Sequence, residues 1–158
     1  MYNQKVLGIF RNPKNFGRIK NADGVGKVGN PVCGDVMHLY IKVGKNKKGE
    51  EIIEDIKFQT LGCVAAIATS SAITQMAKGK TIKEVLKINK KKVVGFLGDL
   101  PPAKVHCSVL AADAIGEAIY DYLAKNKRPI PSFLEKQHQR IEREKELIEE
   151  KFGRGTVK

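Results

Sequence analysis

Two segments of alternating apolar and polar residues, separated by a short turn, constrain the fold more than any other feature of the chain. Every second residue over 37–43 is apolar, and residues 52–60 carry Ile52, Ile56 and Phe58 on one predicted face. A period of two is typical of a strand that buries one of its faces. Because the intervening turn contains glycine and lysine, the two strands are predicted to form an antiparallel hairpin.

Helical patterns dominate the rest of the chain. An alanine-rich apolar segment directly follows the second strand and predicts a buried helix, and prolines bound several of the other helices. The predicted helices cover residues 2–10, 64–77, 81–88, 91–97, 105–123 and 132–151, and a weak first strand covers residues 24–28. This order indicates the α+β class. We expect a small antiparallel three-stranded sheet with helices packed on one side, plus an extra charged C-terminal helix.

Side-chain patterns add detail to three of these helices. Capping boxes are predicted where Thr81 is followed by Glu84 and where Ser132 is followed by Glu135. The inward candidates of the helix over 105–123 are Val109, Ala112, Ile119 and Leu123. The last helix carries Leu134, Ile141 and Ile148 at intervals of seven residues. Such a short stripe more often docks a helix on its own domain than forms a coiled coil.

The domain organisation follows from the same patterns. We expect a domain over residues 1–128 and a charged helical extension over residues 129–158. No apolar segment approaches the roughly 18 residues that cross a membrane, and no signal-peptide pattern follows the first residues. We therefore expect a cytoplasmic protein without a membrane partner.

A net charge of +12 favours a negatively charged partner. The lysines concentrate in residues 45–48 and 78–92, and no aromatic residues are interleaved with them as in single-strand binders. No helix-turn-helix or zinc-finger pattern is present. We therefore expect no nucleic acid as a partner, and an acidic protein fits this surface better.

Three cysteines stand at the boundaries of predicted elements. Cys33 lies in a turn between Pro31 and Gly34, Cys63 stands where a strand ends and a helix begins, and Cys107 lies in the first turn of a helix. The positive end of a helix favours the thiolate, which is the form that binds metal. A lone cysteine is usually a small buried apolar residue. Three cysteines at such boundaries predict a set of metal ligands instead.

Harder ligands accompany two of the cysteines. Asp35 follows Cys33 by two residues, and His106 directly precedes Cys107. Three thiolates with one carboxylate or imidazole suit either a tetrahedral zinc ion or an iron–sulfur cluster, and the spacing leaves both open. The candidate metal ligands are Cys33, Asp35, Cys63, His106 and Cys107. The two remaining histidines are assigned to a strand surface and to a solvated helix face, His38 and His138 respectively.

Four motifs around these residues occur in a recognisable order. They are residues 28–35 (VGNPVCGD), 60–63 (TLGC) with 66–71 (AIATSS), 78–80 (KGK) and 100–108 (LPPAKVHCS). Together they resemble the U-type iron–sulfur scaffold family, which comprises IscU and the N-terminal domain of NifU. The resemblance runs from about residue 5 to residue 122. It implies a scaffold without enzymatic turnover, on which a labile 2Fe–2S cluster is built and then transferred to apo-proteins.

The resemblance also implies roles for single residues. Cys33, Cys63 and Cys107 would hold the cluster, and Cys107 would first accept persulfide sulfur from a cysteine desulfurase. Asp35 would aid metal loading and keep the cluster labile, and His106 would be a fourth ligand or its neighbour. Zinc would occupy the apo form, and two copies of the chain could share one cluster as a homodimer.

The segment Leu100, Pro101, Pro102, Ala103 and Lys104 resembles the part of IscU proteins that a DnaK-like chaperone binds. The alternative is that its two prolines only stop one helix before the next.

Two further functions are weighed against the scaffold. One is a zinc-dependent sulfur acceptor of the SufU branch, whose members typically carry an insertion between the second and third cysteines and lack a histidine beside the third. The short interval and His106 favour the scaffold. The other is a protein with purely structural zinc, although closed zinc sites usually draw on local pairs of ligands.

Overall fold

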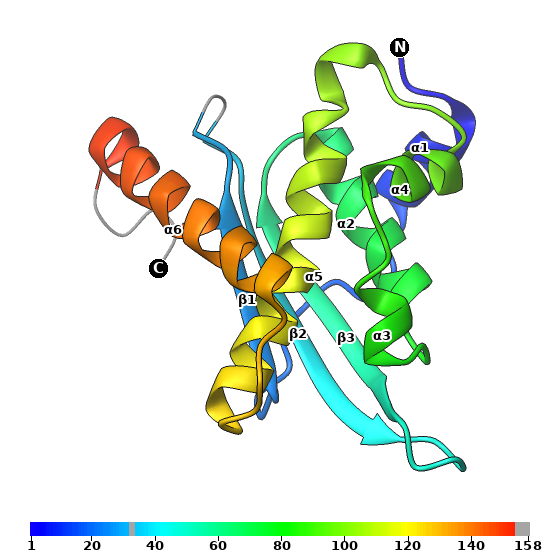
Figure 1. Cartoon of the computed structure of the whole chain (residues 1–158). Helices are drawn as coiled ribbons and strands as arrows, with labels where there is room; N and C mark the ends of the chain where they lie inside the picture. The colour runs from blue at the N-terminus through cyan, green and yellow to red at the C-terminus, as the bar shows by residue number, and fades with distance from the viewer. Residues whose placement is uncertain (32–33, 154–158) are drawn as a thin grey trace.

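The predicted sheet is the centre of the fold. The computed structural model describes residues 1–31 and 34–153, and all structural statements concern these residues. Strands β1 (Gly24–Gly29), β2 (Val36–Lys45) and β3 (Glu51–Leu61) form an antiparallel sheet in the order β1-β2-β3 (Figure 1). The alternation that predicted the hairpin is therefore confirmed, and so is the weak first strand.

One residue of the hairpin faces the other way from the prediction. The pairing is regular up to Lys42, but Val43 pairs with Ile53 and leaves Glu54 as an extra residue on β3. Such a bulge reverses the alternation beyond it. Ile53 is consequently fully buried, whereas Ile52, which the sequence placed on the buried face, lies at intermediate exposure.

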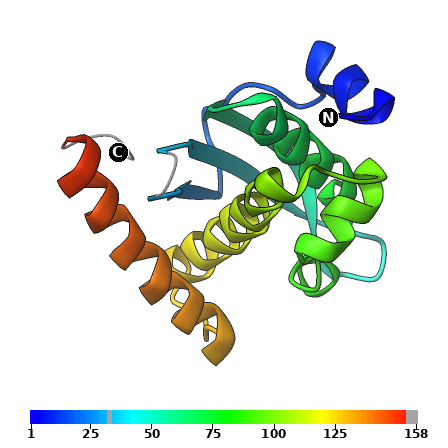
Figure 2. The same ribbon diagram turned by 90° about the horizontal axis from the view of Figure 1, so that it is seen from above.

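Helices cover one face of the sheet, as predicted. Helices α2 (Val64–Ala77) and α5 (His106–Lys125) pack directly on the strands, and the shorter elements surround them (Figures 1 and 2). These are α1 (Gln4–Arg11), α3 (Ile82–Val85), α4 (Lys90–Leu97) and the 3₁₀ turn η1 (Pro102–Lys104). The capping box of Thr81 and Glu84 is present at the start of α3. No described helix is both long and apolar enough to cross a membrane.

Two glycines let α5 lie against β1. A Cβ atom on Gly26 would stand 2.1 Å from the carbonyl oxygen of Ala114, and one on Gly24 would stand 2.2 Å from that of Ala118. Only a strand without side chains at these positions can approach a helix backbone so closely. The β1–α5 contact therefore depends on Gly24 and Gly26.

The inward face of α5 differs in part from the prediction. Ile119 and Leu123 are buried as expected, whereas Val109 and Ala112 are only partly buried. The face toward β1 is lined by small residues such as Ala114, because the strand lies so close. Val109 and Ala112 border instead a hollow of about 270 Å³ between α5 and the starts of α4 and α6.

Helix α6 (Ser132–Phe152) lies along α5 and β1 (Figure 2). Its stripe of Leu134, Ile141 and Ile148 is buried, so the prediction that it docks on its own domain is confirmed. The capping box predicted at Ser132 is wrong. Ser132 already lies inside the helix, and the N-cap residue is Pro131, whose carbonyl accepts the first helical hydrogen bonds. The division of the chain at residue 128 stays a prediction.

Candidate metal centre

Three elements meet at one end of the sheet and bring most of the predicted ligands together. Cys63 is the N-cap residue of α2, directly after β3 ends. His106 and Cys107 open α5 after the η1 turn, and Asp35 directly precedes β2. The predicted positions at the starts of helices are therefore confirmed for Cys63 and Cys107. Cys33 lies outside the described residues.

The four described candidates converge within a few ångströms. The Sγ atoms of Cys63 and Cys107 stand 3.9 Å apart, and Sγ of Cys63 stands 3.9 Å from Oδ2 of Asp35. The Nε2 atom of His106 lies 3.6 Å from Sγ of Cys107. The ligand atoms of Asp35, His106 and Cys107 all lie within 4.8 Å of one another, which is close enough for one metal ion.

Burial gives the site a closed side and an open side. Cys107 is fully buried and its backbone carbonyl accepts a hydrogen bond from Thr69 Oγ1 at 3.2 Å, so α5 and α2 are joined directly beneath the site. Cys63, Asp35 and His106 are only partly buried. Two soft sulfur ligands with an imidazole and a carboxylate suit zinc or iron. These three residues are therefore partly accessible to solvent.

A glycine beside Cys63 allows the carboxylate to approach. A Cβ atom on Gly62 would stand 2.7 Å from Cβ of Ala66 and 3.2 Å from Cγ of Asp35. Any larger residue at position 62 would therefore push Asp35 away from the thiols.

Two further residues of the site were not assigned to it from the sequence. The pKa of Lys104 is raised, first by Cys63 and then by Tyr2, with smaller effects from Cys107 and Asp35. Burial raises the pKa of Tyr2, and Cys63 adds to this. Lys104 thus supplies a positive charge beside the thiols.

Tyr2 precedes α1, which begins later than expected. The helix predicted from residue 2 starts at Gln4, since the Asn3 side chain caps it by accepting the amide of Val6 at 2.8 Å. No local pattern links Tyr2 to cysteines so distant in the chain. The proximity of Lys104 to Cys107 in the sequence was the one available signal for that residue.

The predicted chaperone segment borders the metal centre. Leu100 is buried at 4% exposure, whereas Pro102 and Ala103 are exposed on the η1 turn. The prolines also separate α4 from α5, as the alternative interpretation requires. Chaperone binding stays a prediction.

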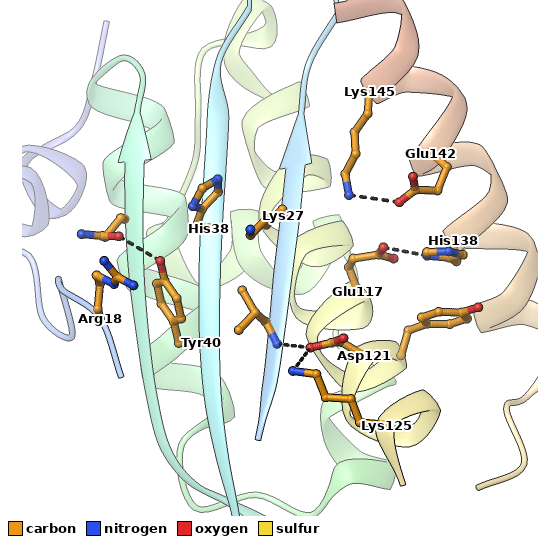
Figure 3. A pocket seen from close by; sticks show the side chains of 13 residues that line it. Arg18, Lys27, His38, Tyr40, Glu117, Asp121, Lys125, His138, Glu142 and Lys145 are labelled. Atoms are coloured by element: carbon orange, nitrogen blue, oxygen red, sulfur yellow. Dashed lines mark hydrogen bonds and ion pairs between the residues drawn. The ribbon is translucent and has the colours of Figure 1, made fainter. Parts of the chain in front are cut away.

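A second polar cluster joins α5 to α6, away from the thiols. Nδ1 of His138 lies 2.6 Å from Oε1 of Glu117 (Figure 3). The imidazole also stacks on Tyr120, with ring centroids 3.8 Å apart. The assignment of His138 to a solvated helix face was therefore wrong, since this ring packs in the α5–α6 seam. Burial raises the pKa of Glu117, and His138 acts against that shift. A hollow of about 690 Å³ borders the seam and the outer face of the sheet, where His38 lies as predicted.

Fold and site together define a small α+β domain that presents thiols, a carboxylate and an imidazole for soft or borderline metals. Residues 1–129 match the family described as the NifU-like N-terminal domain. The chain belongs to this family.

Named relatives agree with this family. An iron-sulfur cluster assembly scaffold protein IscU 1 of Archaeoglobus fulgidus is 62% identical over 126 residues, which cover 80% of this chain and 79% of the relative. IscU of Haemophilus influenzae is 50% identical over 127 residues, which cover 78% of this chain and 97% of that protein. IscU of Aquifex aeolicus is 47% identical over 127 residues, covering 80% and 79%.

Solved structures share the fold. The NifU-like N-terminal protein of Brucella abortus has a TM-score of 0.62 at 17% identity and covers 78% of this chain and 94% of its own. A putative SUF-system scaffold of Fervidobacterium islandicum has a TM-score of 0.59 at 21% identity, with coverage of 75% and 96%. At these identities the likeness concerns the fold alone.

Proposed function

We propose that this protein is a scaffold on which a labile 2Fe–2S cluster is assembled and from which it is passed to apo-proteins. The observation that carries the proposal is the pair of thiols of Cys63 and Cys107, 3.9 Å apart, with the carboxylate of Asp35 at 3.9 Å from the first. The names of the relatives support the same function. The cluster is cargo that the protein builds and releases, and we assign the protein no catalytic turnover of its own.

Sulfur enters by thiol–persulfide exchange at Cys107. Its thiolate attacks the outer sulfur of a persulfide on a cysteine desulfurase, so that an S–S bond forms on Cys107 and the desulfurase thiolate leaves. Two such sulfur atoms must gain four electrons in total to become sulfide. Two ferrous ions supply two electrons on becoming ferric, and an external reductant of the dithiol or ferredoxin class supplies the other two.

The remaining ligands divide the work of holding and releasing the cluster. A carboxylate binds ferrous iron readily but is a hard ligand beside thiolates, so Asp35 aids loading and keeps the cluster transferable. Cys33 and Cys63 hold the cluster with Cys107, and His106 supplies a fourth ligand. A homodimer that shares one cluster would use the open side of the site, and the exposed turn of residues 102–103 is available there to a DnaK-like chaperone.

A second candidate uses the same ligands. Asp35, His106 and Cys107 within reach of one ion, with the thiol of Cys63 3.9 Å from both Asp35 and Cys107, also suit tetrahedral zinc, as in a zinc-dependent sulfur acceptor. The two functions can be told apart by what happens to bound zinc. A scaffold exchanges zinc for iron and sulfide, whereas a zinc-dependent sulfur acceptor keeps it.

Anaerobic reconstitution with ferrous iron, cysteine and a cysteine desulfurase tests the proposal. We expect a visible chromophore, a 2Fe–2S Mössbauer signature and transfer to an apo-ferredoxin. Cys33→Ser, Cys63→Ser or Cys107→Ser should each abolish a stable cluster. His106→Ala should weaken it, whereas His38→Ala, the same change on the outer face of the sheet, should not. Tightly held zinc with no chromophore would favour the sulfur acceptor instead.

Asp35→Ala tests the lability of the cluster separately. Loss of the hard ligand should give a longer-lived cluster, measured by timed visible absorbance. A faster decay would contradict the role assigned to Asp35.

A further inference from the structure

The end of α6 packs against the loop between β1 and β2. Residues 30, 31, 34 and 35 of this loop are described, and they include the predicted ligand Asp35. Ile148 and Val36 form a small buried cluster of their own, with exposed fractions of 0% and 7%. Phe152 lies over Gly34, because a Cβ atom there would stand 3.2 Å from Cζ of the ring. In Figures 1 and 2 the end of α6 lies toward the end of the sheet where β1 ends and β2 begins.

Two backbone hydrogen bonds join the described residues of this loop to one another. The amide of Gly34 donates to the carbonyl of Asn30 at 2.8 Å, and the amide of Asn30 donates to the carbonyl of Asp35 at 2.9 Å. Gly34 has a φ of +78°, which favours glycine, and its missing side chain leaves room for the aromatic ring. Lys151 Nζ adds a hydrogen bond to the carbonyl of Pro31 at 3.4 Å.

The other half of α6 is fastened to α5. Asp113 accepts hydrogen bonds from Gln137 at 2.8 Å and from Arg140 at 2.7 Å, and Glu117 pairs with His138 (Figure 3). Both carboxylates are more than nine-tenths buried. At about 1.5 Å per residue, a helix of this length spans roughly 32 Å. Contacts with α5 therefore fix the first half of α6, and the end of the helix contacts the loop.

We propose that α6 orders the described part of this loop, residues 30–31 and 34–35, and that Phe152 is the positioning residue through which it does so. The proposal rests on the proposed function, since it concerns how Asp35 is held before metal binds. A loop that is already ordered costs less conformational entropy on binding, so its affinity for the ion is higher. Phe152 lies beyond residues 1–129, the part of the chain that the family match covers.

Phe152→Ala tests this proposal in the full-length, reduced protein. The first readout is amide hydrogen exchange over residues 29–36 in the metal-free state, which should become faster. The second is zinc affinity by chelator competition. If the ordered loop falls to about a third of the population, the apparent Kd for zinc rises about threefold.

Two further variants test whether the effect is specific to the ring of Phe152. Phe133→Ala removes another ring from α6 at its far end, with a similar exposed fraction of 53% against 46% for Phe152, and should leave loop exchange and zinc affinity unchanged. Phe152→Leu keeps an apolar contact and should restore both. Neither Phe152 variant should lower the thermal stability of the whole protein, because the ring is half exposed.

The outcomes separate the two proposals. If amide hydrogen exchange in the loop is unchanged in Phe152→Ala, α6 does not order the loop, whatever the zinc affinity. Faster exchange with unchanged zinc affinity would refute the positioning role. If the unaltered protein binds neither zinc nor a cluster, the proposed function fails, whereas the exchange rates still decide whether α6 orders the loop.

Discussion

Gly26→Ala should destabilise the protein, because it inserts a methyl group between β1 and α5. The added Cβ would stand 2.1 Å from the carbonyl oxygen of Ala114 and 2.7 Å from the amide nitrogen of Ala118. A carbon and a carbonyl oxygen in contact stand about 3.3 Å apart. The helix would have to move by roughly 1.2 Å to restore that distance. Both neighbours are backbone atoms, so no side-chain rotation relieves the clash.

The magnitude follows from two opposing terms. Overpacking costs about 1–3 kcal/mol, and the rigid backbone on both sides places Gly26→Ala near the upper end. Replacing glycine also restricts the unfolded chain, which offsets about 0.4–1 kcal/mol. We expect a net loss of about 2 kcal/mol, or a fall in Tm of about 4–8 °C.

Gly95→Ala is the matched control. It is the same substitution within α4, where a Cβ atom would meet nothing within 4 Å. Alanine in a helix is more favourable than glycine by about 0.5–1 kcal/mol, so this variant should be more stable than the unaltered protein.

Urea unfolding followed by circular dichroism measures both variants. We expect them to differ by about 3 kcal/mol at an unchanged m-value. Because α5 carries Cys107, Gly26→Ala should also weaken zinc binding, whereas Gly95→Ala should not. Equal stability of Gly26→Ala and the unaltered protein would refute the close β1–α5 packing.

Two further predictions concern other parts of the fold. Burial raises the pKa of Glu51, but hydrogen bonds from Tyr122 and Arg128 outweigh it and hold the pKa below its ordinary value of 4.5. The resulting stability is present above pH 4.5 and is lost as the pH falls through the lowered pKa, so Glu51→Gln should flatten the acid limb of a urea-unfolding series. Asp113→Ala should cost about 1–2 kcal/mol, because it leaves the half-exposed Arg140 without its buried partner. Asp113→Asn, which keeps an acceptor, should cost less; an equal loss in both variants would contradict this reason.

Local patterns predicted most of the fold. Helix α2 covers the predicted residues 64–77, and the capping box of Thr81 and Glu84 opens α3. These features depend on neighbours in the sequence, which periodicity and capping rules describe well. Ile52 was misassigned because a bulge at Glu54 depends on how two strands pair, and the pattern of one strand does not contain that information.

The candidate site shows the same division. Asp35, Cys63, His106 and Cys107 could be assigned because each lies in a recognisable motif, and the structure brings these four together. Tyr2 and the end of α6 could not, since each reaches the site or its loop through packing between segments far apart in the chain. Cys33 lies outside the described residues and stays a predicted ligand.

The packing around each predicted ligand predicts the order in which the ligands would release a bound cluster. Cys107 is buried at the start of a helix that lies on β1, and its carbonyl is bonded to α2. Cys63 is the N-cap residue of α2, and its carbonyl accepts a hydrogen bond from the amide of Ile67 at 3.1 Å. Asp35 belongs instead to a loop that two backbone hydrogen bonds and the end of α6 restrain. A cluster held between a fixed pair of thiols and a lightly restrained loop should open on the loop side first, so loss of Phe152 should speed transfer more than it slows assembly.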